Sequence, residues 1–294
     1  MKSKTFILVI IGLIGLIVIF ALPNNEEPTS PSDNNAEQQL TLSDIHGLEV
    51  AIDDPDKLYL PNHQGLYFQG EDGRIQKVGS IRDDFMGFVI SPSDSSTFYA
   101  SGHPRTGGNF GVIRTSDSGT SWEDISEGLD GPVDFHTMAI DVADNQLLYG
   151  YYRGALQRTT DAGASWQYLD NAPDQIIQLS AGEKDDQLYA STVSGLFVSQ
   201  DKGKNWAQVD SMNETVTAIE VNVNSGQMFA YGVNSGLLIS TDSGVSWEKT
   251  SFGSEGEQVL YIASSKSDPE QVYLITKSLG IYKSTDSGET WNLR

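Results

Sequence analysis

The stretch STDSGVSW, from Ser240 to Trp247, recurs along the chain and decides its fold. Four further copies end at the other four tryptophans: TSDSGTSW (Thr115 to Trp122), TTDAGASW (Thr159 to Trp166), SQDKGKNW (Ser199 to Trp206) and STDSGETW (Ser284 to Trp291). Successive tryptophans are 44, 40, 41 and 44 residues apart. A fixed period of this length is typical of a propeller or a solenoid.

A weaker copy precedes these five. An aromatic residue stands 17 or 18 residues before four of the tryptophans. Tyr59 extends this series to the start of the domain, where Gln76 takes the tryptophan position. In that copy Glu71 takes the aspartate position and Gly73 keeps the glycine. Six copies of about 42 residues fill residues 44–294, which predicts an all-β, six-bladed β-propeller with four strands per blade.

Turn signals place four strands within each copy. In the fifth copy, turns of the Asn-Ser-Gly and Asp-Ser-Gly type separate strands over residues 216–223, 227–231 and 237–241, and Trp247 opens the fourth strand. The motif Ser/Thr-x-Asp-x-Gly-x-x-Trp therefore occupies the turn between the third and fourth strands. There its polar side chains can bond backbone N–H groups and its glycine can adopt a positive φ. We expect a structural role for its aspartates, which are Asp117, Asp161, Asp201, Asp242 and Asp286.

Composition excludes several classes of function. Lys and Arg number 18 against 40 Asp and Glu, so the formal net charge is −22. Such a chain is a poor ligand for nucleic acid, because phosphate binding needs clustered Lys and Arg. The absence of Cys excludes disulfides, thiolate metal sites and cysteine nucleophiles.

The first 43 residues predict a membrane tether. The uncharged run from Thr5 to Leu22 follows Lys2 and Lys4 and is just long enough to cross a bilayer. We expect residues 1–22 to form a single transmembrane helix at the cell membrane, with the C-terminal domain extracytoplasmic; a signal segment that is cleaved to release a secreted domain is the alternative. Residues 23–43 are polar and contain three prolines, which predicts a disordered, flexible linker.

All four histidines of the chain fall in two registers of the repeat. Thirteen residues before the second-strand aromatic stand His46, Met86 and His136. Four residues after it stand His63 and His103. In an antiparallel meander both registers lie on one face, opposite the aspartate-motif turns. We therefore expect the four histidines, all from the first three copies, to converge near the mouth of the central channel.

Charged residues share this face. An acid stands fifteen residues before the aromatic in five of six copies, which favours a role in the turn, although Asp84 and Asp134 are candidates because they lie beside the histidine register. Asp83 has no counterpart in the other copies. Three arginines could clamp a carboxylate or sulfate or be ordinary solvated loop residues: Arg82, Arg105 and Arg153. The glycines of the insertion at residues 103–109 would let it fold over a ligand.

These residues support three hypotheses. The first is a module that binds a small ligand, a glycan or a protein partner through the histidine face, with Met86, Arg105 and Arg153 beside the imidazoles. The second is glycoside hydrolysis, for which the candidate acids are Asp83, Asp84 and Asp134. The third is a copper or zinc site, because imidazoles, a thioether and carboxylates suit these ions; its candidate ligands are His46, His63, His103 and His136.

The repeated motif resembles the Asp-box of the bacterial neuraminidase repeat (BNR) family, which includes sialidases, sortilin-type receptor domains and photosystem II assembly propellers. More narrowly, Ile45-His46-Gly47-Leu48, His63-x-Gly65-Leu66, Ser101-Gly102-His103-Pro104 and Asp134-Phe135-His136 look like an exported bacterial Asp-box family that often carries the label glycosyl hydrolase. The resemblance covers about residues 44–294. It implies the propeller fold and raises a sialidase-like activity as an expectation.

Overall fold

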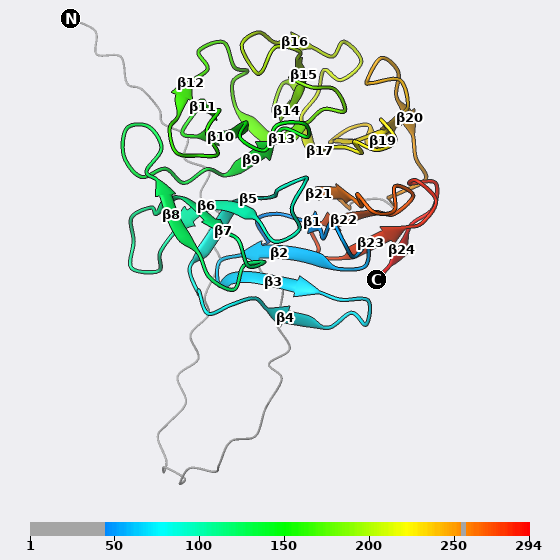
Figure 1. Ribbon diagram of the computed structural model, residues 1–294. Coiled ribbons are helices and arrows are strands. Elements are labelled where there is room, and N and C mark those ends of the chain that lie inside the picture. The colour runs from blue at the N-terminus through cyan, green and yellow to red at the C-terminus, as the bar shows by residue number, and fades with distance from the viewer. Residues whose placement is uncertain (1–44, 254–256) are drawn as a thin grey trace, which may run out of the picture. The chain divides into compact units, whose positions relative to one another are not determined.

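Six antiparallel sheets of four strands each make up the computed structural model over the residues it describes, 45–253 and 257–294 (Figure 1). Each sheet is a meander of four strands that follow one another in the chain. The first strands of successive sheets lie next to one another, from β5 round to β21, and β1 and β2 of the first sheet contact β21 and β5, which closes the ring. The predicted all-β, six-bladed propeller is confirmed.

The histidine-bearing half of the ring consists of three blades. Blade 1 contains β1 (Glu49–Val50), β2 (Leu58–Asn62), β3 (Gly65–Gln69) and β4 (Ile75–Lys77). Blade 2 contains β5 (Asp84–Ile90), β6 (Phe98–His103), β7 (Gly111–Thr115) and β8 (Glu123–Ser126). Blade 3 contains β9 (Thr137–Ile140), β10 (Leu148–Tyr152), β11 (Ala155–Thr159) and β12 (Gln167–Tyr168).

The other half of the ring has the same construction. Blade 4 contains β13 (Ile176–Ala181), β14 (Leu188–Thr192), β15 (Gly195–Ser199) and β16 (Ala207–Gln208). Blade 5 contains β17 (Val216–Val221), β18 (Met228–Gly232), β19 (Gly236–Ser240) and β20 (Glu248–Lys249), each within two residues of its predicted place. Blade 6 contains β21 (Val259–Ser264), β22 (Val272–Thr276), β23 (Ile281–Ser284) and β24 (Asn292–Leu293).

Side-chain contacts join blade 6 to blade 1. The hydroxyl of Tyr273 donates to the backbone oxygen of Pro55 at 2.8 Å, and Lys283 pairs with the carboxylate of Asp56 at 2.6 Å. The guanidinium of Arg294 also donates to the backbone oxygen of Asp56, at 2.6 Å. All four strands of each blade come from one stretch of the chain, so the first and last blades are held together by packing and by these bonds and exchange no strand.

The Asp-box turns have the structural role predicted for them. In blade 2, Asp117 accepts hydrogen bonds from the side chain of Thr115 and from the backbone and hydroxyl of Ser121, and the indole of Trp122 donates to Gly119 O at 3.1 Å. Bonds of this kind recur in the other four copies. In blade 2 the hydrogen bonds that Asp117 accepts lower its pKa to about 2, chiefly through the Ser121 hydroxyl.

Two consecutive residues of each box have positive φ, although only the glycine was predicted to. The residue before the glycine is left-handed in all five copies, with φ between 57° and 62°: Ser118, Ala162, Lys202, Ser243 and Ser287. The turn of blade 1 also differs from expectation. There Asp72, and not Glu71, accepts the backbone N–H of Arg74, because this shorter turn lacks the hydroxyl and the tryptophan that complete the box.

The N-terminal predictions concern residues outside the described part of the chain. These are the anchor at residues 1–22 and the linker at residues 23–43. Asp44, the first residue of the predicted domain and the acid fifteen residues before Tyr59, also lies outside that part. Among residues 45–253 and 257–294 the structure has no helix of the length and apolar character needed to span a membrane.

Candidate functional site

Four histidines and two aspartates from blades 1 to 3 meet on one face of the propeller. His46 precedes β1, and His63 lies in the turn between β2 and β3. Asp84 begins β5 directly opposite His103 at the end of β6. The remaining pair, Asp134 and His136, precedes β9. The structure thus brings together the four imidazoles that the sequence analysis expected to converge, and it places two candidate acids among them.

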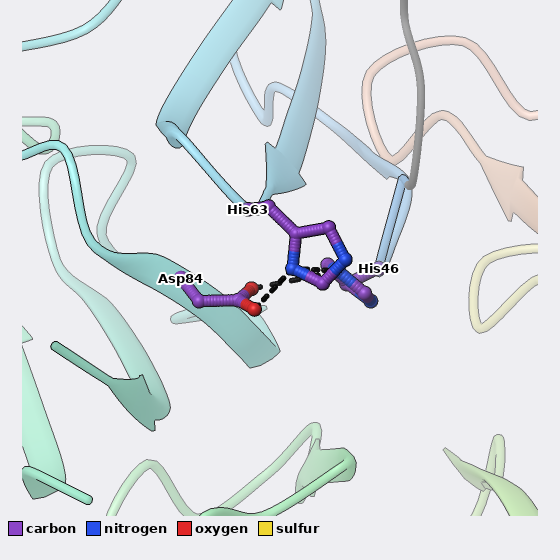
Figure 2. Close-up of side chains that lie close together, drawn as sticks. All are labelled: His46, His63 and Asp84. Atoms are coloured by element: carbon purple, nitrogen blue, oxygen red, sulfur yellow. Dashed lines mark hydrogen bonds and ion pairs between the residues drawn. The ribbon is translucent and has the colours of Figure 1, made fainter. Parts of the chain in front are cut away.

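The first group within this cluster consists of His46, His63 and Asp84 (Figure 2). His46 Nε2 lies 3.1 Å from His63 Nδ1 and 3.5 Å from Asp84 Oδ1. His63 Nδ1 contacts Asp84 Oδ2 directly. One ligand atom from each residue lies within 4.8 Å of those from the other two, so the three side chains can hold one metal ion.

The second group consists of His103, Asp134 and His136. His103 Nδ1 and His136 Nε2 each lie 3.4 Å from Asp134 Oδ2. The other nitrogen of His103, Nε2, lies 3.3 Å from Asp84 Oδ2. The imidazole of His103 therefore stands between the two carboxylates and links the second group to the first.

Buried aromatic residues beside the cluster fix the segments that carry it. Phe135, between Asp134 and His136 in the segment before β9, is fully buried and packs on Trp166 with ring centroids 4.9 Å apart. In the same way Phe85 follows Asp84 and packs on an Asp-box tryptophan, Trp122, at 5.1 Å. The Asp-box tryptophans thus anchor the strand starts that present the cluster.

The two carboxylates are the most buried members of the cluster. Asp84 is 4% exposed and Asp134 is 7% exposed. The Oδ1 atom of each is buried and accepts no hydrogen bond from the described residues. The Asp134 carboxylate raises the pKa of His136 above its ordinary value, because it accepts from the protonated ring and attracts its charge, while burial opposes the shift. The two carboxylates are therefore buried beneath the more exposed imidazoles of His63 and His136.

Other predicted site residues lie near the cluster with different contacts. Asp83 accepts the backbone N–H of Arg105 at 3.1 Å, so it helps to hold the turn at residues 103–109. The guanidinium of Arg153 lies 4.9 Å from the ring centroid of Tyr152, and Arg153 has a φ of 50° in a tight hairpin turn. Arg82 and Arg105 are exposed, and Met86 is half-buried at an irregularity in the pairing of β5 with β6.

A cavity of about 240 Å³ at the central channel extends from the cluster, and residues of all six blades line it. His46 and His136 lie at this cavity, as do Glu49 of blade 1 and Glu220 of blade 5. Burial raises the pKa of Glu49 to about 8 and that of Glu220 to about 7. The sequence analysis did not select these two acids. Both are charged residues within predominantly apolar inner strands, and this unusual placement could have identified them.

No family model matches the chain. A curated xyloglucanase from a Paenibacillus species is 23% identical over 195 residues, which cover 60% of this chain and 18% of that protein. The narrower likeness to an exported bacterial family therefore stays a prediction.

Several solved structures share the fold. The GH74 xyloglucanase from Xanthomonas campestris matches with a TM-score of 0.60 and 18% identity over 85% of this chain and 45% of that one. The GH74 enzyme from Niastella koreensis matches with a TM-score of 0.59 and 12% identity over 84% and 46%. YCF48 bound to a D1 peptide matches with a TM-score of 0.55 and 16% identity over 86% and 82%.

The chain thus spans less than half the length of these two GH74 enzymes and most of YCF48. At these identities the likeness shows the fold alone. The six-bladed fold and the five Asp-box turns fit a propeller of the BNR type, and its structural neighbours include glycosyl hydrolases.

Proposed function

We propose that this propeller is a binding module whose ligand at the histidine face is a transition-metal ion, with zinc or copper the ions that its ligands suit. His46, His63 and Asp84 would bind the ion. The observation that carries the proposal is the convergence of two imidazole nitrogens and a buried carboxylate within 4.8 Å of one another. Each of these groups is a common ligand for zinc, and imidazole also suits copper.

The spacing of these atoms supports a bound ion. Two ligand atoms that bind one zinc ion at about 2.0–2.1 Å in tetrahedral geometry lie roughly 3.4 Å apart. The distances from His46 Nε2 to His63 Nδ1 and to Asp84 Oδ1 are 3.1 and 3.5 Å, close to this value. His63 Nδ1 and Asp84 Oδ2 are in direct contact, and an ion would separate them. An ion would also neutralise a carboxylate that is 4% exposed and whose Oδ1 accepts no hydrogen bond from the described residues.

Three protein ligands leave at least one coordination position for an exchangeable group. His46 belongs to the cavity at the channel, so a small molecule there could reach the ion. The net charge of −22 favours the approach of cations. We further propose, from the sequence of residues 1–22, that the module is tethered outside the cytoplasmic membrane, where it would meet ions and ligands of the cell exterior.

Glycoside hydrolysis is the second candidate, and the pair of carboxylates on the histidine face is the observation that motivates it. Asp84 and Asp134 are two carboxylates on one face, as such chemistry requires, and the His103 imidazole separates them. Release of reducing sugar from xyloglucan or of phenolate from aryl glycosides, lost in both Asp84→Asn and Asp134→Asn, would support this activity. Inertness across these substrates would count against it.

The test of metal binding uses the full chain purified without a polyhistidine tag. The protein is stripped with a chelator, dialysed and titrated separately with zinc and copper(II), with bound metal measured by elemental analysis. We expect stoichiometric binding, and His63→Ala should weaken binding at the His46–His63–Asp84 site by more than the roughly 10–100-fold that loss of an outer-shell partner costs.

Gln64→Ala is the matched control, because Gln64 is exposed and adjacent to His63 but contributes no metal-ligating group. This variant should bind metal like the parent protein. Failure of the parent protein to hold either ion above the level of a chelator-treated blank would refute the proposed function.

A further inference from the structure

We infer that the central channel is a second binding site, which takes a small organic cation of the primary alkylammonium class between the carboxylates of Glu49 and Glu220. This site lies beside the proposed metal site but needs no bound metal ion. Its support is the shape of the channel, the balance of charge on its wall and a carboxylate that has no hydrogen-bond donor.

Two adjoining cavities lie along the inner strands. The larger, of about 240 Å³, lies at the starts of these strands, on the histidine face. The smaller, of about 80 Å³, is lined by residues at the ends of these strands, such as Ile90 and Ile140. Glu49, Met138 and Glu220 line both cavities. These three side chains therefore lie where the two cavities meet.

The wall of the larger cavity carries negative charge that basic side chains do not balance. Glu49 and Glu220 line this cavity, and no lysine or arginine among the described residues does. Lys266 lines the smaller cavity but not the larger. Burial raises the pKa of Glu49, the charge of Lys266 opposes the rise, and the charge of Glu220 adds to it. A cation between the two carboxylates would stabilise their ionised forms.

The two carboxylates differ in their partners. Glu220 accepts hydrogen bonds from the backbone N–H and the hydroxyl of Ser264, at 3.0 and 2.5 Å. The carboxylate of Glu49 accepts none from the described residues. Removing a carboxylate from water without giving it a donor is unfavourable, so a ligand with N–H donors would stabilise it there. An alkylammonium group has three such donors.

The rest of the wall suits the carbon chain of such a ligand. The larger cavity is lined by these apolar and aromatic side chains: Leu48, Phe88, Met138, Leu260, Tyr261 and Ile262. The hydrophobic effect favours burial of a short alkyl chain against them. Gln178 and Thr217, which also line the cavity, donate to backbone oxygens at 3.0 and 2.8 Å. The channel thus presents acids for the ammonium group and an apolar wall for the chain.

The experiment uses the metal-free full chain, so its outcome is independent of metal binding. Calorimetric titration at pH 9, above the pKa values of Glu49 and Glu220, compares butylammonium with 1-butanol, a neutral molecule of similar shape. Butylammonium, like a lysine side chain, stays protonated at this pH. We expect saturable one-to-one binding of butylammonium and no binding of 1-butanol at the same concentrations.

Three variants locate the site. Glu49→Gln and Glu220→Gln should each weaken butylammonium binding by about 10-fold or more, because each removes a charge and weakens a charge-assisted hydrogen bond. Leu260→Trp should abolish binding without a change in net charge, because the larger side chain would fill the cavity. Glu248→Gln is the matched control, since it removes one charge from an exposed acid of β20, and it should bind like the parent protein.

Four outcomes would overturn the inference. They are no binding of butylammonium to the parent protein, equally tight binding of 1-butanol, full affinity in Leu260→Trp, and equal weakening in Glu248→Gln and Glu49→Gln. The last would mean that butylammonium responds only to the overall negative charge. Circular dichroism checks that each variant is folded. None of these outcomes affects the proposed metal site, which the zinc and copper titrations test separately.

Discussion

Blades 1 to 3 and blades 4 to 6 share one scaffold but differ on one face. All six are four-stranded meanders, and five carry a complete Asp-box turn. At the turn between the second and third strands, however, the first half has His63, His103 and Arg153, whereas blades 4 and 5 have Val193 and Val233. These two valines are 44% and 49% exposed. The Asp-box turns that recur in five blades lie on the opposite face. The turn between the second and third strands can therefore differ from blade to blade.

The acids that precede the inner strands show the same contrast. Asp84 and Asp134 are buried and face imidazoles of the first half. Glu214, at the equivalent position in blade 5, accepts bonds from the backbone of Asn234 and the hydroxyl of Ser235, so it caps a turn of its own blade. The acid at this repeat position therefore either caps a turn or faces imidazoles. Its role depends on the side chains in the neighbouring turns between second and third strands.

The largest expected effect comes from a feature that both halves share. Trp166 in blade 3 is 9% exposed and donates to Gly163 O and Ser126 Oγ. Trp166→Ala should lower the free energy of unfolding by about 3–5 kcal/mol, because it leaves a cavity and removes both bonds. Urea unfolding measures the loss. The equivalent change in blade 4, Trp206→Ala, should cost a similar amount, and a loss confined to blade 3 would contradict the idea of a common scaffold.

The next effect separates the halves. Asp84→Asn should weaken zinc binding by more than about 100-fold, because it removes the charge of the carboxylate that contacts His46, His63 and His103. Glu214→Gln should leave zinc affinity unchanged and lower stability by about 1 kcal/mol through its turn bonds. Calorimetric titration and urea unfolding test the pair. Equal loss of zinc affinity in both variants would remove the distinction between the two acids.

A third prediction concerns the channel, where the halves meet. Burial raises the pKa of Glu49 from an ordinary 4.5 to about 8; the charge of Lys266 opposes this rise, and the charge of Glu220 adds to it. The folded state therefore binds this proton more tightly than the unfolded state does. The resulting stability is fully present below about pH 4.5 and is lost as the pH rises through about 8.

Glu49→Gln removes this titration. In metal-free protein the variant should match the parent at pH 5 and be more stable by at least about 1 kcal/mol at pH 9, since one pKa unit corresponds to about 1.4 kcal/mol. Urea unfolding at pH 5, 7 and 9 checks the trend, with Glu248→Gln, which changes an exposed acid of β20, as the control. A constant difference between Glu49→Gln and the parent across this range would show that Glu49 titrates normally.

The sequence predicted the fold because the Asp-box is a local structure. Its bonds join residues at most four positions apart, so the motif specifies the turn, and the period of the turns specifies the ring. The histidine cluster was predictable for a related reason, since rotation about the ring maps equal registers onto one face. The turn of blade 1 was misread because Glu71 aligns with the box aspartates, while the shorter turn is capped by Asp72.

The sequence could not identify which acids would be buried. Asp84 and Glu214 occupy one register, and their different roles depend on neighbours brought close by folding. Glu49 and Glu220 were missed because blade 1 and blade 5 meet only across the channel. The contacts that close the ring were equally out of reach, since Lys283 and Asp56 are 227 residues apart and belong to no motif.

The smallest expected effect lies at this closure, where the last blade of one half joins the first blade of the other. Burial opposes ionisation of Asp56, but the hydrogen bond and charge of Lys283, together with the Tyr273 hydroxyl and the charge of Arg294, outweigh it and lower the pKa of Asp56. The bond to Lys283 therefore stabilises the fold above the ordinary pKa of 3.8, and this stability is lost as the pH falls through the lowered value. Both side chains are about one quarter exposed, so water screens the pair only in part.

A double-mutant cycle with Asp56→Asn and Lys283→Met should give a coupling energy of about 0.5–1 kcal/mol at pH 7, which should shrink when unfolding is measured at pH 3. Lys202 and Asp186 form the matched control, because this exposed pair lies within one half of the ring. Its coupling should be smaller and should fall further in high salt. If the two couplings are equal, the join between blades 6 and 1 depends on apolar packing, and the Asp56–Lys283 pair is an ordinary surface ion pair.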